Sequence, residues 1–349
     1  MMQMNLMYIV PSLGNVGPTN VVLSLVKKLS QNGIDISIFS FRDGEMKDEF
    51  SHYSKVIITR NIFTIIKAAR KEETVVHSHG FFPDFINAIL NTLLLNKNNF
   101  STIHNFIKLD YKLLKGDILG TIYTSIHKLF LKKINFTVNC SKSAMVYNNI
   151  SKYYIYNGVD DYYSPLNHHS KEIEKKIRLV CLGVLSKRKN IEVILSAFAS
   201  KDRDNMELYV IGNGENYKNF KEKYNQKNIF FTGKINYPFN IINDCDFIIS
   251  SSLAEGFPLA VLESLSCRLS YILSKIPPHE EIFSLTHENG FLCENTTDSY
   301  IKVIDSLEKI DYEHLKNNCR NYYLSNFTTE IMAAKYLDLY KQALYGTNS

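Results

Sequence analysis

Short apolar runs of strand length alternate with longer stretches of helical spacing over the first 140 residues. The pattern predicts a strand over 6–11, a loop with two glycines, and a helix over 18–29. Pro18 suits the first turn of that helix, because its missing N–H has no helical partner there. Further strands are predicted over 34–39, 101–104 and 136–139, and two more are predicted to end near Ile58 and near His77. This alternation is typical of βαβ units and a mainly parallel sheet.

The same alternation begins again at residue 177. Strands are predicted over 177–183, 206–212, 228–233, 246–252 and 269–275. The helices between them are predicted near 189–200, 215–225, 238–245 and 257–267. Each series is long enough to close a sheet of its own. The chain is therefore expected to be an α/β protein with two Rossmann-like domains.

The joint between the two series is expected between residues 157 and 174, where glycine, proline and a polar run interrupt the pattern. After about Asp298 the chain reads as helical, and a closing helix over 328–345 is expected to cross back to the first domain. The expected division is a first Rossmann-like domain over 1–163, a second over 164–327, and the closing helix over 328–349.

Composition excludes several classes of protein. The chain has 349 residues, of which 45% are hydrophobic, enough for a sizeable core. No run approaches the roughly 20 apolar residues of a membrane-spanning helix, and the N-terminus lacks a secretory pattern. The six cysteines form no Cys-x-x-Cys pair, so neither a metal site nor disulfides are expected. We therefore expect a cytoplasmic protein without a metal.

The net charge of +5 lies in the first half of the chain. Residues 108–133 carry six lysines against Asp110 and Asp117, with leucines, isoleucines and tyrosines at near-helical spacing. One interpretation is an amphipathic helix pair with a solvated lysine face. The other is a surface that contacts anionic lipid headgroups or a lipid-phosphate substrate. A charge of +5 over the whole chain is a weak footprint for nucleic acid, which is not expected as a partner.

The strongest candidate block is DFIISSSLAEGFPLAVLESLSC, residues 246–267. A strand runs into a small polar loop and then a helix, and ligands of open α/β sheets bind at the carboxyl ends of strands. Amides at the helix start, 256–260, can hold an anion. Glu255 precedes the helix and Glu263 is expected two turns into it, so the two carboxylates need not share a face. Spacing alone leaves two ordinary surface glutamates as the alternative.

Glu255 and Glu263 form a Glu-x7-Glu motif, and the chain resembles the retaining glycosyltransferases of family 4. That resemblance implies the GT-B fold, in which two Rossmann-like domains face each other across a cleft. It also implies that the first domain binds the acceptor and the second binds the nucleotide-sugar. Besides the glutamate block, the similar segments, in family order, are PSLGNVGPTNVVLSLVKKL (11–29), HSHGFFPD (77–84), STIHNF (101–106), NCSKSA (139–144), YNGVD (156–160), LGVLSKRKNIEVILSAF (182–198), LYVIGNGE (208–215) and FFTGKI (230–235).

The resemblance implies a catalytic group of His104, Lys189 and Glu255. His104 would contact the donor sugar, and Glu255 would hold a sugar hydroxyl near the anomeric carbon. Lys189 would offset the charge of the diphosphate leaving group. The loop with Gly14 and Gly17 would approach the diphosphate and the acceptor, because glycine lets backbone come close.

Further donor-binding roles follow from the same resemblance. Glu263 would accept hydrogen bonds from the ribose hydroxyls, while Gly212 and Gly214 would line the nucleotide. The backbone of Gly256, Phe257, Pro258 and Leu259 would bind sugar and phosphate.

One position departs from the family pattern. The family usually has arginine five residues before the lysine, and this chain has Val184 there. The diphosphate thereby loses a bidentate donor. Arg188, adjacent to Lys189, is the candidate replacement.

The remaining motifs are weaker. His77 and His79 end a predicted strand and are expected to face different ways, which favours strand-end packing or acceptor contact over a metal site. Gly212-Asn213-Gly214 lacks the third glycine of a dinucleotide site.

The expected activity is retaining transfer of a hexose or N-acetylhexosamine from a nucleotide-sugar, with UDP as the expected nucleotide, and without a cofactor. The expected acceptor is a saccharide, in particular a lipid-linked oligosaccharide of surface-polysaccharide assembly at the inner face of the plasma membrane. The alternatives are an epimerase or phosphorylase on the same fold and a non-catalytic nucleotide-sugar-binding protein.

Overall fold

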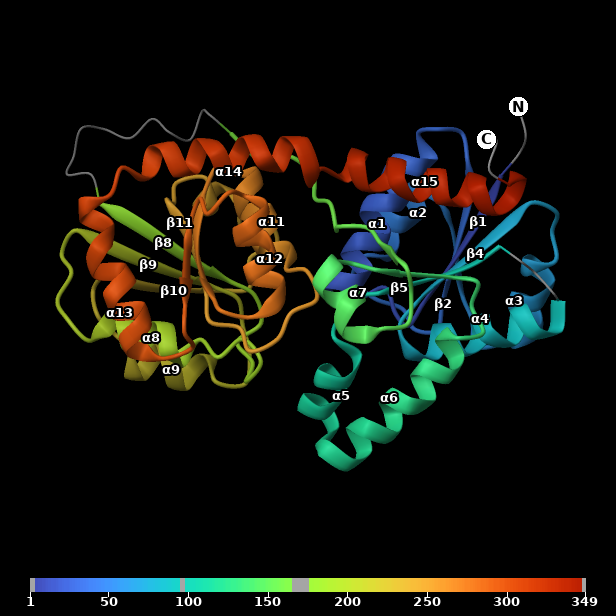
Figure 1. Ribbon diagram of the computed structural model, residues 1–349, viewed down its shortest axis with the longest axis horizontal. Helices are drawn as coiled ribbons and strands as arrows, with labels where there is room; N and C mark the ends of the chain where they lie inside the picture. The colour runs from blue at the N-terminus through green and yellow to red at the C-terminus, as the bar shows by residue number, and fades with distance from the viewer. Residues whose placement is uncertain (1–3, 95–97, 165–175, 347–349) are drawn as a thin grey trace. The chain divides into compact units, whose positions relative to one another are not determined.

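The computed structural model describes residues 4–94, 98–164 and 176–346. The chain forms two compact units, one of residues 1–158 with 329–349 and one of residues 159–328 (Figure 1). Each unit contains one sheet in which every strand pair is parallel. The α/β prediction with two Rossmann-like domains is therefore confirmed.

The first unit has a seven-stranded sheet of order β3-β2-β1-β4-β5-β6-β7. Its central strands are buried on both faces, as the near-continuous apolar runs predict. The strands are β1 (Asn5–Val10), β2 (Asp35–Ser40), β3 (Lys55–Ile58), β4 (Thr74–His79), β5 (Asn99–Ile103), β6 (Phe136–Asn139) and β7 (Tyr153–Tyr154). The helices are α1 (Gly17–Ser30), α2 (Lys47–Tyr53), α3 (Ile62–Ala69), α4 (Phe81–Leu94), α5 (Ile107–Lys115), α6 (Asp117–Leu131), α7 (Lys142–Asn148) and α15 (Thr329–Tyr345).

The C-terminal helix α15 packs on the first unit, beside α1 (Figure 1). The Tyr340 hydroxyl lies 3.2 Å from the Tyr8 hydroxyl and 2.6 Å from His77 Nδ1. The Tyr336 hydroxyl lies 2.7 Å from Thr102 Oγ1. These buried contacts attach the helix to β1, β4 and β5, and the predicted return of the closing helix to the first domain is confirmed.

The second unit has a six-stranded sheet of order β10-β9-β8-β11-β12-β13. Leu179, Leu208, Phe247 and Ile272 are fully buried in its core. The strands are β8 (Ile177–Leu182), β9 (Met206–Ile211), β10 (Ile229–Gly233), β11 (Phe247–Ser250), β12 (Ser270–Ser274) and β13 (Phe291–Cys293). The helices are α8 (Glu192–Ala199), α9 (Tyr217–Lys223), α10 (Phe239–Ile242), α11 (Leu259–Ser266), α12 (Pro277–Leu285), α13 (Thr297–Ser306), the 3₁₀ helix Leu307–Lys309 and α14 (Tyr312–Asn326).

The boundary between the units lies within the expected joint of residues 157–174 but not at its expected position. The division falls after Gly158 rather than after residue 163, and α15 begins at Thr329. Val159 forms a parallel bridge with Thr328 and accepts a hydrogen bond from the Tyr323 hydroxyl at 2.9 Å. Arg320 forms an ion pair with Asp161 at 2.6 Å. These contacts to α14 attach residues 159–161 to the second unit. Residues 165–175 of the expected joint lie outside the described residues.

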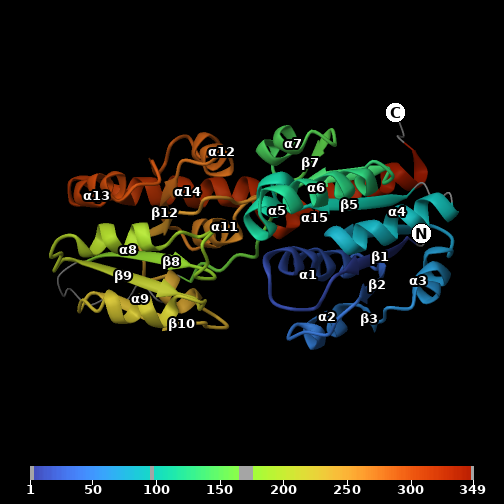
Figure 2. The same cartoon turned by 90° about the horizontal axis from the view of Figure 1, so that it is seen from below.

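Helix α6 has an unusual distribution of side chains. Its buried positions are Gly120, Thr124, His127 and Leu131, whereas most of its isoleucines and leucines are exposed. A side chain at Gly120 would clash with the backbone of Lys112, so this glycine lets α5 and α6 approach closely. Helix α6 packs against α4 (Figure 2), where Phe81 contacts the rings of His127 and Phe130. The solvated face of α5 and α6 therefore carries isoleucines and leucines as well as lysines, which the first of the two interpretations does not predict.

Candidate active site

The candidate site of the second unit lies at the carboxyl ends of β8 and β11. These strands are neighbours at the point where the strand order reverses, which is where open α/β sheets bind ligands. The loop after β8 carries Arg188 and Lys189, and the loop after β11 carries Ser252 and Glu255. More than 60 residues of sequence separate the pair in the first loop from the pair in the second, and the fold brings the two pairs together.

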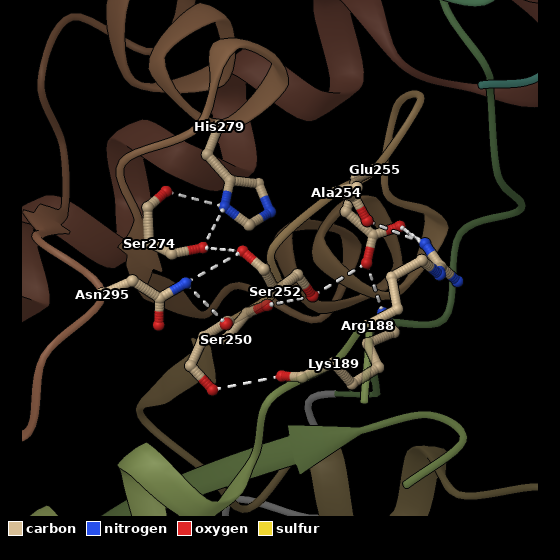
Figure 3. A network of polar contacts seen from close by, with 10 residues as sticks. Arg188, Lys189, Ser250, Ser252, Ala254, Glu255, Ser274, His279 and Asn295 are labelled. Carbon is tan, nitrogen blue, oxygen red and sulfur yellow. Dashed lines mark hydrogen bonds and ion pairs between the residues drawn. The ribbon is translucent and has the colours of Figure 1, made fainter. Parts of the chain in front are cut away.

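Glu255 is buried between two cations (Figure 3). Its Oε1 lies 2.7 Å from Lys189 Nζ, and its Oε2 accepts a hydrogen bond from Arg188 Nη1 at 2.9 Å. Ser252 Oγ donates a further hydrogen bond to Oε1 at 2.8 Å. Burial alone would raise the pKa of Glu255, but Lys189 and Arg188 more than offset it and lower that pKa to about 2. The carboxylate is therefore ionised and fixed in direction at neutral pH.

The loop after β8 is bonded to the loop after β11 along its length. The Leu253 N–H donates to the Arg188 carbonyl at 2.8 Å, and Arg188 Nη1 donates to the Ala254 carbonyl at 2.8 Å. Ser251 Oγ donates to the Asn190 carbonyl at 2.8 Å. Asn190 has a left-handed φ of 49°, so α8 starts only at Glu192 rather than at the expected 189. This arrangement holds both cations against Glu255.

Three residues that the sequence analysis missed support this loop (Figure 3). Ser274 Oγ donates to the Ser252 carbonyl at 2.6 Å, and Asn295 Nδ2 donates to the Ser251 carbonyl at 3.0 Å. His279 Nδ1 lies 2.9 Å from the Ser274 carbonyl, and burial lowers the pKa of His279 to about 4. A signal was available for Ser274, which ends a predicted strand beside β11. Asn295 follows β13, a strand too short to be predicted.

Gly212 and Gly214 have a structural role in the second unit. Gly212 has a φ of 142°, and a Cβ there would lie 1.8 Å from the Gly183 carbonyl oxygen. At Gly214 a Cβ would lie 2.4 Å from the Leu185 carbonyl oxygen. Both glycines therefore let the loop after β9 pack against the loop after β8. Their expected contact with a nucleotide stays a prediction.

Helix α11 begins at Leu259, not at 257, because Pro258 is extended. Pro258 also lines a small cavity at the ends of β8 and β11, together with Gly183, Lys189 and Ser250. Gly256 and Phe257 are buried, and the Phe257 ring packs against Phe327 at 5.4 Å between ring centroids. The start of α11 thus faces the cavity that contains Lys189.

Glu263 lies about one turn into α11, not two, because the helix starts later than expected. The residue is partly buried, and its carboxyl group forms no hydrogen bond with any described residue. Burial raises the pKa of Glu263 to about 7, against the opposing effect of Lys189. Val184 is 65% exposed, and Arg188, four residues on, is the arginine that reaches Glu255.

The other predicted site residues belong to the first unit. Gly14 lies in the loop after β1, and Gly17 is the first residue of α1. A Cβ at Gly14 would meet only ordinary contacts, so its conformation does not by itself require glycine. His104 follows β5, and its Nε2 lies 2.8 Å from His79 Nδ1.

The expectation that His77 and His79 face different ways is wrong. Residues two apart on a strand point to the same face, and the two rings lie 4.4 Å apart between centroids. Both side chains are buried at the end of β4, and His77 bonds Tyr340 and Thr102. Within the described parts of the chain, no group of three or more His, Cys, Asp or Glu is arranged to hold a metal ion.

Comparison with known proteins identifies the second unit. Residues 165–323 match the family described as Glycosyl transferases group 1. This range of the chain is therefore similar to the group 1 glycosyltransferases. The site around Glu255 lies in this range, so the family resemblance drawn from the glutamate block is confirmed at the level of the group.

Relatives of the whole chain point in the same direction. The chain is 27% identical to the O-antigen biosynthesis glycosyltransferase WclY of Escherichia coli over 97% of this chain and 98% of the relative. It is 24% identical to the capsular polysaccharide biosynthesis glycosyltransferase CapH of Staphylococcus aureus, over 85% of this chain and 88% of CapH. Among solved structures, HepE of Anabaena in complex with UDP has a TM-score of 0.81 at 14% identity, covering 96% of this chain and 99% of HepE. At this level of identity, that likeness shows a shared fold and nothing more.

No helix in the described ranges is both long and apolar enough to cross a membrane.

Proposed function

We propose that this protein is a retaining glycosyltransferase that moves a hexose or N-acetylhexosamine from a UDP-sugar to a lipid-linked saccharide of surface-polysaccharide assembly. The observation that carries the proposal is Glu255, buried between Lys189 and Arg188 in the range that matches the group 1 glycosyltransferases. Support for the pathway comes from similarity along nearly the whole chain to the O-antigen glycosyltransferase WclY. Support for UDP comes from the UDP complex of HepE.

The charges at the site suit a diphosphate leaving group. Lys189 and Arg188 share one carboxylate, so one positive charge is in excess beside the start of α11. A helix start adds unpaired N–H groups and the positive end of the dipole. In the proposed reaction these groups stabilise negative charge as the bond from the anomeric carbon to the diphosphate oxygen breaks. Arg188 supplies the guanidinium group that the family usually has at the position of Val184.

The proposed transfer retains the configuration of the sugar. The bond between the anomeric carbon and the diphosphate breaks while the acceptor hydroxyl forms a new bond on the same face. The acceptor proton passes to the leaving phosphate oxygen. Glu255, fixed and ionised, accepts a hydrogen bond from a hydroxyl of the donor sugar, and the role proposed for His104 is a contact with the same sugar. The residues assigned here require no metal.

A membrane-facing role accompanies this function. Most apolar side chains of α5 and α6 face away from the core, including Leu114 at 70% and Ile118 at 79% exposure. The lysines at 108 and 115 of α5, and those at 132 and 133 directly after α6, are exposed as well. An apolar surface edged by lysines fits an anionic lipid surface better than water. The proposed site of action is therefore the inner face of the plasma membrane, where lipid-linked acceptors are held.

The proposal is tested by mass spectrometry of a nucleotide-sugar panel incubated with lipid extract as acceptor pool. The wild type is expected to add one sugar mass from one donor, and Glu255→Gln to lose at least about 100-fold of that rate. Glu222→Gln, an exposed glutamate of α9, is the matched control and should keep full activity. Epimerised donor without acceptor, phosphate-dependent turnover, or UDP binding without any turnover would each contradict the transferase.

A further inference from the structure

The strand order of the first sheet reverses between β1 and β4. Open α/β sheets form ligand crevices outside the carboxyl ends of strands at such a reversal. A cavity of about 360 Å³ lies at this position. Its lining residues come from the segments after four neighbouring strands, β3, β2, β1 and β4, with the last of them in the first turn of α4. They are Pro11, Phe41, Arg42, Arg60 and Phe82. None of the residues assigned above to the donor or to catalysis lines this cavity.

Two arginines give the cavity its charge. Arg42 and Arg60 are both exposed, and neither forms an ion pair with a described residue. Arg60 Nε donates a long hydrogen bond of 3.4 Å to the Phe41 carbonyl, which directs its guanidinium toward the end of β2. Two guanidinium groups therefore line the cavity, and neither is paired with the carboxylate of a described residue.

The nearest acidic side chains along the chain are already engaged. Asp43 lies 3.2 Å from Lys47 and accepts a hydrogen bond from the Gly44 N–H at 2.8 Å. Glu45 accepts a hydrogen bond from the Asn15 N–H at 3.3 Å. These contacts hold the loop after β2 against the loop after β1. They leave both guanidinium groups available to a ligand.

The opposite wall of the cavity is aromatic. The rings of Phe41 and Phe82 meet edge to face with centroids 4.8 Å apart. Phe41 is buried, whereas Phe82 is 49% exposed. An exposed aromatic surface beside convergent polar groups is typical of sites that bind small organic ligands. The ligand should therefore join an anionic group to a carbon-rich body.

We propose that this cavity binds a doubly charged phosphate group on the acceptor, either a sugar phosphate or the diphosphate of a lipid-linked saccharide. This inference rests on the proposed function, since it assigns the acceptor. Guanidinium groups bind phosphate oxygens in bidentate fashion. Two of them match the two charges of a phosphate monoester or diphosphate, whereas a sugar carboxylate would neutralise only one. Phe82 provides the wall for the attached sugar or lipid carbon.

The test is titration calorimetry on the full chain saturated with UDP, so that the site around Glu255 is filled. The probes are N-acetylglucosamine 1-phosphate, neutral N-acetylglucosamine and glucuronate. The phosphate ester is expected to bind at least about tenfold more tightly than the other two. Arg42→Gln and Arg60→Gln are each expected to weaken its binding about tenfold. Arg70→Gln, an exposed arginine at the end of α3, is the matched control.

Each outcome decides the matter. Equal binding of glucuronate, or equal losses in Arg70→Gln, would overturn the phosphate assignment. If the two cavity variants reduced binding to anionic vesicles, the ligand would be bulk lipid headgroup and not the acceptor. Unchanged UDP affinity with no binding of the phosphate ester would refute this inference alone. Absence of UDP binding would refute the proposed function instead, and titration without UDP would still report on the cavity.

Discussion

His79 Nδ1 lies 2.8 Å from His104 Nε2, so one of these two nitrogens carries a hydrogen and donates a hydrogen bond to the other. Burial lowers the pKa of His79 well below its ordinary value and that of His104 to about 4, so both rings are neutral at pH 7. The other nitrogen of His79, Nε2, is buried without a partner among the described residues. Buried N–H groups without an acceptor are rare. His79 is therefore the donor, and His104 carries its own proton on Nδ1.

His79 thus acts as a positioning residue for His104. We expect His79→Phe to lower kcat for sugar transfer about tenfold, because His104 loses the bond that fixes its tautomer. His79→Asn, whose amide nitrogen replaces Nδ1, should restore most of the rate. UDP affinity, measured by calorimetry, should not change in either variant. Equal rate losses in both variants would show that His79 only fills space.

Lys189 and Arg188 are expected to differ in their effect on stability. The Lys189 side chain is 18% exposed and that of Arg188 is 39% exposed, so solvent screens the arginine pair more strongly. Lys189→Met leaves Glu255 buried with one partner fewer and should lower the free energy of unfolding at pH 7 by about 3 kcal/mol. Arg188→Gln should cost about 1 kcal/mol or less. Urea denaturation measures both.

The pH dependence of these losses follows from the carboxylate. Glu255 has a folded pKa of about 2 against an ordinary value of 4.5. The stability it contributes is present above pH 4.5 and is lost as the pH falls toward 2. The Lys189→Met deficit should therefore shrink at pH 4, where Glu255 in the variant can take up a proton. Lys187→Met, an exposed neighbour, is the control, and a similar deficit there would contradict the assignment.

Glu263 should make nucleotide binding depend on pH near neutrality. Its pKa is raised to about 7, so it is partly protonated in the folded protein. Its contribution to stability is full below pH 4.5 and is lost as the pH rises through 7. In the proposed role the ionised carboxylate accepts hydrogen bonds from ribose hydroxyls, so UDP should bind more tightly at pH 8 than at pH 6.

The matched variant is Glu263→Gln, which cannot ionise. UDP itself titrates near pH 6, so the quantity of interest is the difference in pH dependence between the wild type and this variant. Calorimetry in two buffers should also show fewer protons released on UDP binding by the variant. Identical pH profiles would remove Glu263 from the nucleotide site.

The alternation of strands and helices was sufficient to predict both sheets. Errors arose where local pattern carries little information. The edge strands β7 and β13 have two and three residues, too few to show a period. The boundary at Gly158 depends on a bridge between Val159 and Thr328, residues far apart in the sequence.

Some residues of the candidate site could likewise be predicted from the sequence, and others could not. Glu255 and Lys189 were found through motifs, because their neighbours in sequence resemble a family. Arg188 entered only as a neighbour of Lys189, and the structure shows its guanidinium on Glu255. His279 and Asn295 lie in segments without a motif, and only the fold brings them beside the loop after β11.

The exposed apolar side chains of α5 and α6 lead to the last prediction. Replacing both Leu114 and Ile118 with glutamine should weaken binding to vesicles that contain anionic lipid at least about tenfold, because each side chain gains up to about 2 kcal/mol on leaving water. Phe63→Gln on α3, where the side chain is 77% exposed, is the matched control and should bind as the wild type. Vesicle sedimentation measures both.

The dependence on salt distinguishes the electrostatic part of vesicle binding from the part due to burial of apolar side chains. Replacing Lys132 and Lys133 with glutamine should weaken vesicle binding at low ionic strength and have little effect at 1 M salt, where the Debye length falls to about 3 Å. The loss in the apolar double variant should persist at high salt, since burial of apolar surface is not screened. If the apolar variant binds as well as the wild type at low salt, α5 and α6 do not enter the membrane, and their leucines must meet another protein.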